Sequence, residues 1–218
     1  MEELVKGIVF DLDGTLVDSL PDIHAASSEM LKSINLEPLP SKQVRSFIGN
    51  GVDKLIRRCL DVYDVNVSED ATRVFMEYYQ ANPTTLSKCY ENVECVLFQL
   101  KLQGLKLGIC TNKPSNLTDK VLEKLNLKRY FETVICGDTL RVKKPDPKPL
   151  LEAINNLGSK PELSIFVGDS EVDMKTALSA NTRFGFFTQG YHKSAPRDVI
   201  CDFHFDSYVE LEKKFQKL

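Results

Sequence analysis

An α/β fold, with a parallel sheet covered by helices on both faces, is the architecture that this sequence predicts. From about residue 92 onward, short apolar runs alternate with stretches whose apolar residues recur at helical spacing. This alternation is typical of a parallel sheet, because the crossover between two parallel strands needs room for a helix. A further block of helical periodicity, residues 17–83, follows the first apolar run and predicts a small inserted α-helical subdomain.

The N-terminal part is predicted to contain one strand, residues 5–10, followed by four helices. Ser19, with Asp22 three residues later, resembles a capping box at the start of the first helix. A Gly-Asn-Gly turn at 49–51 separates the second helix from the third. We interpret the aromatic residues of the fourth helix as core packing, because they follow a helical stripe. The four apolar stripes lie within residues 23–34, 44–48, 52–60 and 74–79.

Beyond residue 92, predicted helices and strands follow one another in turn. Asn92 is a candidate N-cap of a helix that Gly104 ends, and Pro147 is suited to the first turn of a later helix. The predicted strands are residues 105–110, 133–136, 164–167 and 183–187. The predicted helical stripes lie within residues 93–100, 117–125, 150–157 and 170–180.

A chain of 218 residues can hold one good-sized core, or a core and a smaller subdomain, and its composition is that of an ordinary soluble protein. A net charge of −3 gives no global reason to bind nucleic acid or an anionic membrane. No apolar stretch is long enough to span a bilayer, and the acidic start, with Glu2 and Glu3, does not resemble a signal peptide. The six cysteines show no metal-ligand spacing. We therefore expect a cytoplasmic protein with free thiols.

Asp11 and Asp13 directly follow the first predicted strand and precede Gly14. Open α/β sheets bind their ligands at this edge, where the strands end. Two carboxylates about 4 Å apart repel by roughly 4 kcal/mol at an effective dielectric of 20, so such a pair favours a cation or a shared proton. Mg²⁺, which binds carboxylates together with waters and phosphate oxygens, is the natural candidate. The alternative is that Asp13 and Gly14 only form a turn.

Two further strands are followed by residues suited to binding phosphate or metal. Thr111 and Asn112 come after residues 105–110, where a hydroxyl and backbone amides before a helix suit a phosphate oxygen. Their alternative role is that of loop or cap residues. Asp169 follows residues 164–167 and mirrors Asp11. Asp173 lies three residues after a serine, so it is either part of the same acidic site or only a capping-box partner.

A lysine-proline segment lies between these two strands. Pro145 favours an extended backbone at Lys144, and Pro147 stiffens the same loop. The two prolines suit a cation that must hold a fixed position. Lys143 is expected to be a solvated neighbour.

These four segments, in this order, resemble the haloacid dehalogenase-like hydrolase superfamily. The resemblance covers the whole chain and implies a Rossmann-like catalytic core, residues 1–16 and 84–218, with a helical cap, residues 17–83. Within the superfamily the sequence is most similar to phosphoglycolate phosphatases. The segments that carry this closer similarity are Ile48-Gly49-Asn50-Gly51, Thr111-Asn112-Lys113 and Lys143-Lys144-Pro145-Asp146-Pro147.

The resemblance implies a phosphatase that works through an aspartyl-phosphate. Asp11 would be the nucleophile, and Asp13 would act as general acid and then general base. Thr111 and Lys144 would complete the catalytic set by binding the phosphoryl oxygens. The predicted substrate-binding residues are Thr111, Asn112, Lys144, Gly14 and Asn50.

The implied cofactor is Mg²⁺. It would be held by the Asp11 side chain, the Asp13 backbone carbonyl and Asp169. Asp173 would support the ion from further out or through a water. The implied partner is a small phosphorylated metabolite, with no nucleic acid and no membrane, and the sequence does not decide between a monomer and a homodimer.

Several other activities stay open at the level of sequence. They are a pyrophosphatase, a sugar-phosphate or nucleotide phosphatase, a β-phosphoglucomutase-like phosphotransferase and a non-enzymatic interaction protein. By the resemblance, Thr15 after the motif glycine fits phosphatases better than mutases. Asp13 favours phosphoryl transfer to water over dehalogenation, because a halide leaving group needs no proton.

Overall fold

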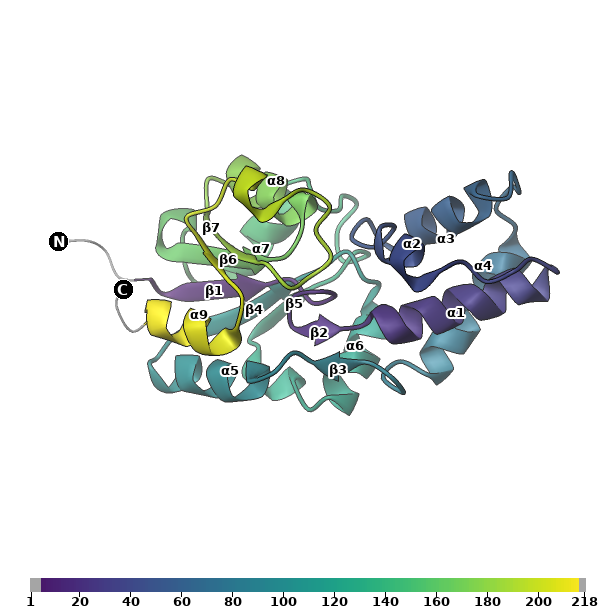
Figure 1. Cartoon of the computed structure of the whole chain (residues 1–218). Helices are drawn as coiled ribbons and strands as arrows, with labels where there is room; N and C mark the ends of the chain where they lie inside the picture. The colour runs from purple at the N-terminus through teal and green to yellow at the C-terminus, as the bar shows by residue number, and fades with distance from the viewer. Residues whose placement is uncertain (1–4, 216–218) are drawn as a thin grey trace.

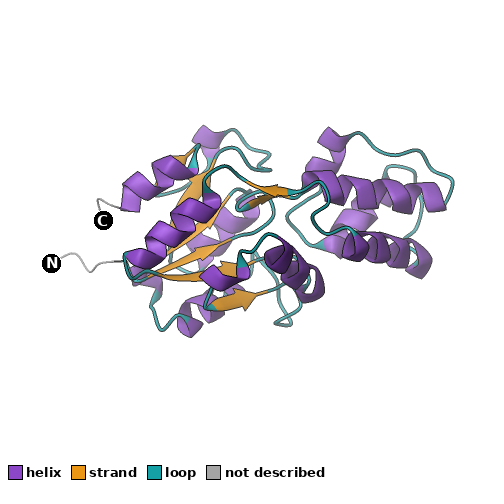
Figure 2. Ribbon diagram, turned by 90° about the horizontal axis from the view of Figure 1, so that it is seen from below, coloured by secondary structure: helices purple, strands orange, loops and turns teal. Residues whose placement is uncertain are grey.

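A parallel sheet of six strands forms the centre of the larger part of the molecule (Figures 1 and 2). The computed structural model describes residues 5–215, so Glu2 and Glu3 lie outside the described residues. The strand order is β5-β4-β1-β6-β7-β8, and every neighbouring pair is parallel. The strands are β1 Gly7–Phe10, β4 Lys106–Cys110, β5 Thr133–Ile135, β6 Ser164–Gly168, β7 Arg183–Phe187 and β8 Phe203–Phe205.

Helices cover both faces of the sheet, and the predicted α/β class is confirmed. Ile8 and Phe10 of β1 pack with α5, α6 and α9, whereas Val9 packs on the opposite face with α7 and α8. Successive side chains of a strand point to opposite faces, so one apolar run supplies both cores. The helices are α5 Val93–Leu102, α6 Ser115–Lys124, α7 Lys148–Asn156, α8 Glu171–Ser179 and α9 Tyr208–Phe215.

A bundle of four helices follows β1 and lies beside the edge where the strands end (Figure 1). Its buried side chains form a hydrophobic cluster separate from the two cores of the sheet, and this cluster also includes Leu117 of α6. The chain enters and leaves the bundle through a short antiparallel pair, β2 (Val17–Asp18) and β3 (Lys88–Cys89). The bundle helices are α1 Leu20–Ser33, α2 Ser41–Arg45, α3 Val52–Asp61 and α4 Glu69–Ala81.

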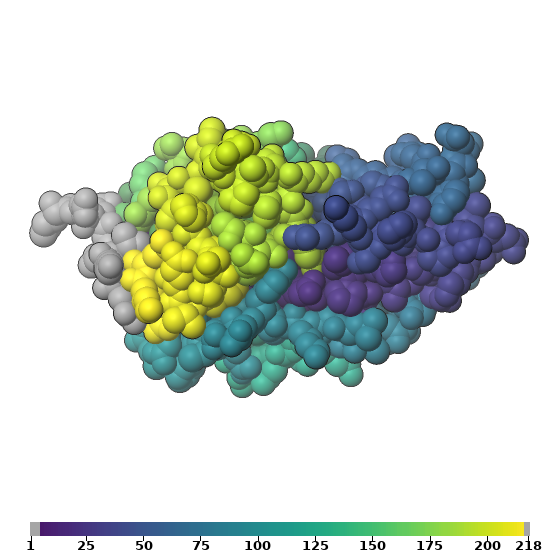
Figure 3. Space-filling view, viewed as in Figure 1, coloured from purple at the N-terminus to yellow at the C-terminus, as the bar shows by residue number. Residues whose placement is uncertain are grey.

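The bundle is packed against the larger part of the molecule (Figure 3). Arg45 of α2 donates a hydrogen bond to the carbonyl oxygen of Gly190, and its guanidinium carbon lies 5.7 Å from the ring centre of Tyr191. On the other side, the Asn112 amide nitrogen donates to the carbonyl oxygen of Gly49 at 2.9 Å. Contacts on two sides therefore hold the bundle over the strand ends in this arrangement.

Two helices begin near the predicted residues, but without the predicted caps. The Ser19 side chain makes no cap hydrogen bond. The Asp22 carboxylate, the other half of the predicted box, accepts from the backbone N–H groups of Leu86 and Ser87 and from the Ser87 hydroxyl. Asn92 precedes α5 with a left-handed backbone, φ 64°, and its side chain does not cap the helix either. Neither predicted cap residue therefore caps its helix with its side chain.

Asp22 joins the start of the bundle to the chain that returns from it, and its side chain is buried. We expect Asp22→Ala to lower the free energy of unfolding by about 3 kcal/mol, because several buried donors lose a charged acceptor. Urea denaturation measures this loss. The control is Glu29→Ala on the same helix, which removes only an exposed ion pair with Lys32 and should cost less than about 0.5 kcal/mol. Equal losses in the two variants would contradict this interpretation.

Candidate active site

Three strand ends bring the predicted site residues to one edge of the sheet. Asp11 follows β1, Thr111 follows β4 and Asp169 follows β6. In the sheet β1 lies between β4 and β6, so its carboxylate is flanked by the other two side chains. Parallel strands all end at the same edge, and this shared edge places residues 158 positions apart, from 11 to 169, within one site.

A buried cluster of three carboxylates lies at this edge. Asp11, Asp169 and Asp173 each offer an oxygen atom, and these three oxygens lie within 4.8 Å of one another. The ammonium of Lys144 lies 2.9 Å from Asp11 Oδ1 and 2.6 Å from Asp173 Oδ1. The structure therefore brings together the lysine and three of the four predicted metal-binding residues.

Burial dominates the electrostatics of this cluster. It raises the pKa of Asp11 from 3.8 to about 7, because desolvation and the nearby Asp173 outweigh the charge of Lys144. Burial also raises the pKa of Asp169, with further contributions from the Asp173 and Asp11 charges. Burial alone would lower the pKa of Lys144, but the two carboxylates outweigh it and the pKa is raised.

The cluster fits a hard divalent cation. Three buried carboxylates face one ammonium, and Asp11 Oδ1 has no hydrogen-bond partner among the described residues, although it forms an ion pair with Lys144. Oxygen ligands of this kind suit Mg²⁺. A cation there would offset the charge that burial makes costly in Asp11 and Asp169.

Asp169 is held in place by both of its oxygens. The Thr15 hydroxyl donates to Oδ1 at 2.6 Å, and the backbone N–H of Tyr191 donates to Oδ2 at 2.5 Å. Gly14 lies beneath this pair with φ 86°, and a Cβ there would come within 2.6 Å of the Tyr191 ring and of Asp169. Its backbone conformation and this close packing require glycine at a predicted substrate-binding position.

Asp173 combines the two roles that the sequence left open. Its Oδ2 accepts from the Ser170 backbone and hydroxyl, and Ser170 Oγ in turn accepts from the Asp173 backbone N–H, which completes a capping box. Its Oδ1 accepts from Lys144 at 2.6 Å. One carboxylate thus begins helix α8 and fixes the lysine of the cluster.

The two predicted asparagines have different positions. The Asn112 amide donates to the carbonyl oxygens of Gly49 and Lys144, and its oxygen accepts from the Lys144 backbone N–H at 3.0 Å. Asn112 therefore holds the lysine loop in place, and it also lines a cavity between the sheet edge and the bundle. Asn50 does not line this cavity, and its side-chain oxygen accepts from Arg58 at 2.8 Å.

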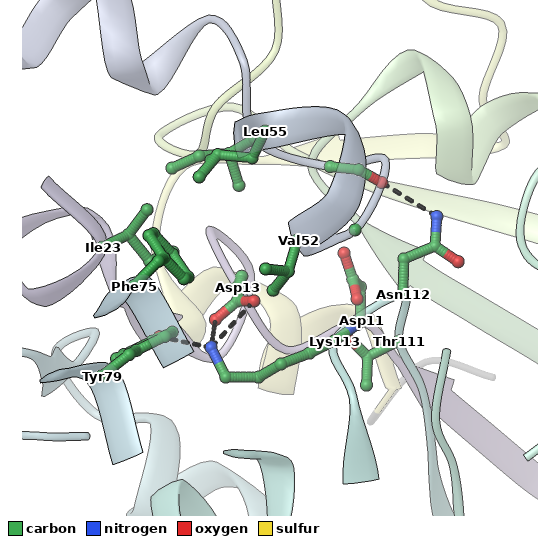
Figure 4. Close-up of a pocket in the computed structure, with 13 residues that line it drawn as sticks. Asp11, Asp13, Ile23, Val52, Leu55, Phe75, Tyr79, Thr111, Asn112 and Lys113 are labelled. Atoms are coloured by element: carbon green, nitrogen blue, oxygen red, sulfur yellow. Dashed lines mark hydrogen bonds and ion pairs between the residues drawn. The ribbon is translucent and has the colours of Figure 1, made fainter. Parts of the chain in front are cut away.

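A cavity of about 40 Å³ lies between the sheet edge and the bundle (Figure 4). This is room for only a few water molecules. The side toward the sheet carries polar groups, which belong to Asp11, Asp13, Thr111, Asn112 and Lys113. The side toward the bundle is mostly apolar and is formed by Ile23, Ile48, Gly49, Gly51, Val52, Leu55, Phe75 and Tyr79.

Comparison with known proteins decides the family. A family model described as haloacid dehalogenase-like hydrolase matches residues 8–187. The chain belongs to the haloacid dehalogenase-like hydrolase family. A phosphoglycolate phosphatase of Cereibacter sphaeroides is 38% identical over 218 residues, covering 98% of this chain and 99% of that protein. Phosphoglycolate phosphatase 1 of Pseudomonas aeruginosa is 40% identical, covering 88% of this chain and 73% of that protein.

A solved structure agrees with these relatives. A predicted phosphoglycolate phosphatase from Haemophilus somnus superposes with a TM-score of 0.91 at 34% identity, covering 96% of this chain and 97% of that one. The resemblance noted in the sequence is confirmed, and the predicted enzyme class, a hydrolase of phosphoric monoesters, agrees with it. Within residues 5–215, no helix of this hydrolase combines the length and apolarity that crossing a membrane requires.

Lys113 is a site residue of this hydrolase to which the sequence assigned no role. Its ammonium is buried, lies 2.9 Å from Asp13 Oδ1 and 3.1 Å from Oδ2, and donates to the Tyr79 hydroxyl. Burial alone would lower the pKa of Lys113, but the Asp13 charge and the Tyr79 contact outweigh it and the pKa is raised. One feature of the sequence could have identified Lys113 as a site residue. It lies two residues after Thr111 at a strand end, beside groups suited to binding an anion.

Proposed function

We propose that this hydrolase is a Mg²⁺-dependent phosphatase that cleaves a small phosphomonoester, 2-phosphoglycolate, through an aspartyl-phosphate on Asp11. The observation that carries the proposal is the position of Asp11, which lines the cavity next to a buried ammonium and two further carboxylates. The names of the relatives from Cereibacter sphaeroides and Pseudomonas aeruginosa supply the substrate.

In the first step the Asp11 carboxylate attacks phosphorus and the alcohol leaves. A carboxylate nucleophile splits one hard displacement into two easier ones, for a reaction in which enzymes reach accelerations of up to ~10²¹. Lys144 neutralises Asp11 and the phosphoryl oxygens. Thr111 Oγ1 accepts from the Lys113 backbone N–H at 3.2 Å. The hydroxyl proton of Thr111 can therefore be donated to a phosphoryl oxygen.

Asp13 is the proposed general acid of the first step and the general base of the second. It lines the same cavity as Asp11, and 15% of its side chain is exposed, so it can reach a group bound there. It gives a proton to the leaving oxygen and later takes one from the water that hydrolyses the aspartyl-phosphate. The alcohol and phosphate are then both released, and Asp11 returns to its starting form.

Mg²⁺ would be held by the side chains of Asp11 and Asp169 and by the backbone carbonyl of Asp13. Asp173 would support it. When bound, the ion would neutralise charge on the phosphoryl group and on the attacking carboxylate. Thr15 and the Tyr191 backbone keep Asp169 oriented for this purpose.

The bundle, within residues 17–83, is the proposed cap, and residues 1–16 and 84–218 are the proposed catalytic core. The apolar wall that the bundle adds to the cavity would exclude water from the reacting groups. The β2–β3 pair, through which the chain passes in both directions, is the natural place for opening and closing.

A panel of phosphorylated metabolites tests the proposal. With Mg²⁺ present, phosphate should be released from 2-phosphoglycolate with a higher kcat/KM than from pyrophosphate, sugar phosphates or nucleotides. Excess chelator should remove the activity, and added Mg²⁺ should restore it. Undiminished activity in chelator would contradict the metal role, and formation of an isomerised sugar phosphate without free phosphate would favour a mutase.

A further inference from the structure

Lys113 is the only cationic side chain among the described residues that line the cavity. It extends from the end of β4 toward the bundle, so that its ammonium lies between Asp13 of the sheet part and Tyr79 of α4 (Figure 4). The ammonium also lies 4.4 Å from the centre of the Tyr79 ring. Lys113 is thus a fixed positive charge where the cavity meets the bundle.

Tyr79 adds a second donor at the same place. Its hydroxyl oxygen accepts from Lys113, and its own proton has no hydrogen-bond acceptor within the described part of the chain. Burial raises the pKa of Tyr79 well above its usual value, so the hydroxyl keeps this proton. A buried ammonium next to an unused hydroxyl proton is suited to an anionic group.

The rest of the bundle side of the cavity offers a ligand no comparable partner. Ile23, Val52 and Phe75 present only apolar side chains there. A long polar tail, such as that of a sugar, would bury hydroxyl groups without hydrogen bonds, which is unfavourable.

We propose that Lys113 and Tyr79 bind the carboxylate of a phosphorylated 2-hydroxy acid, and that Lys113 determines specificity for this class. The inference rests on the proposed function, in which Asp13 protonates the ester oxygen of the substrate. In a 2-hydroxy acid only one carbon separates that oxygen from the carboxylate. The two groups that would receive them, Asp13 and Lys113, are in direct contact at 2.9 Å.

Binding exchanges the partners of Lys113. In the structure its ammonium donors point to Asp13 and Tyr79, and a substrate carboxylate would take over part of the role of Asp13. A neutral carboxamide keeps one acceptor oxygen, but it carries no charge to pair with Lys113 and has an NH2 donor in place of the second carboxylate oxygen. Sites built around buried donors discriminate strongly against analogues that lack the matching group.

The test compares 2-phosphoglycolate with its neutral carboxamide, which has nearly the same shape. The wild type should prefer the acid by at least ~10²-fold in kcat/KM, the scale at which a polar site rejects an unmatched analogue. Lys113→Met should bring this ratio close to one, whereas Lys113→Arg should keep most of the preference. Tyr79→Phe, which leaves the Lys113–Asp13 pair in place, should lower the ratio mainly through KM for the acid.

Lys120→Met is the matched control, because Lys120 is an exposed lysine outside the cavity, whose ammonium donates a hydrogen bond to the Gln80 carbonyl oxygen. The ratio of its kcat/KM values for the acid and the carboxamide should equal that of the wild type. Equal losses with both compounds in Lys113→Met would overturn the inference and leave Lys113 as a positioning residue for Asp13. Failure of the wild type to release phosphate from either compound would instead overturn the proposed function together with this inference.

Discussion

Replacement of Asp11 by asparagine is expected to abolish phosphate release while leaving the fold intact. The variant keeps the shape of the side chain but loses the nucleophile. Because burial raises the pKa of Asp11 to about 7, ionised Asp11 is unfavourable in the metal-free protein, and a neutral amide removes that cost. We therefore expect a melting temperature at or above that of the wild type in chelator, measured together with phosphate release.

Asp61→Asn on α3 is the matched control, since Asp61 is an exposed aspartate outside the cavity. It should change neither the rate nor the melting temperature. Wild-type turnover by purified Asp11→Asn would show that another group attacks phosphorus.

Replacement of Lys144 by alanine is expected to lower both activity and stability. Loss of one preorganised electrostatic donor costs at least ~10² in kcat. The same change leaves Asp11 and Asp173 buried without their ammonium partner, and buried charges that lose their partner strongly destabilise a protein. The melting temperature in chelator should therefore fall, and Mg²⁺ should restore part of it by binding the folded state.

The neighbouring Lys143 provides the control for this prediction. Its side chain is 39% exposed, and its ammonium lies 3.5 Å from an Asp53 carboxylate that is itself exposed. Lys143→Ala should change kcat and the melting temperature only slightly. Similar effects of the two substitutions would mean that loop charge in general, and not the buried contact with Asp11, accounts for the role of Lys144.

The sheet and the position of the site at its edge could be predicted from the sequence, because local patterns indicate both the strands and the residues at their ends. Apolar runs ending in Asp11, Thr111 and Asp169 identify strands and their ends, and the parallel arrangement then brings those ends together. The last strand and helix, β8 and α9, were not predicted. Residues 203–205 form a run of only three residues, interrupted by His204, which is too short for a periodic signal.

Contacts between distant residues could not be read from the sequence. Asp22 fits a capping box locally, but the returning chain 64 residues later provides better donors. Tyr79 follows a core stripe and does pack in the bundle core, yet its hydroxyl reaches Lys113. The Lys113–Asp13 contact spans 100 residues and follows from the pairing of β1 with β4, whereas the Lys113–Tyr79 contact depends on how the bundle is placed against the sheet.

Trapping of the phosphoryl group on Asp11 is the most direct test of the proposed mechanism. Wild-type protein would be mixed with 2-phosphoglycolate and Mg²⁺, quenched within one turnover and treated with borohydride, which reduces an acyl phosphate to an alcohol. Peptide mass spectrometry should then find homoserine at position 11, and none in protein quenched without substrate. Reduction at another carboxylate, or at none while phosphate is released at the normal rate, would contradict Asp11 as the nucleophile.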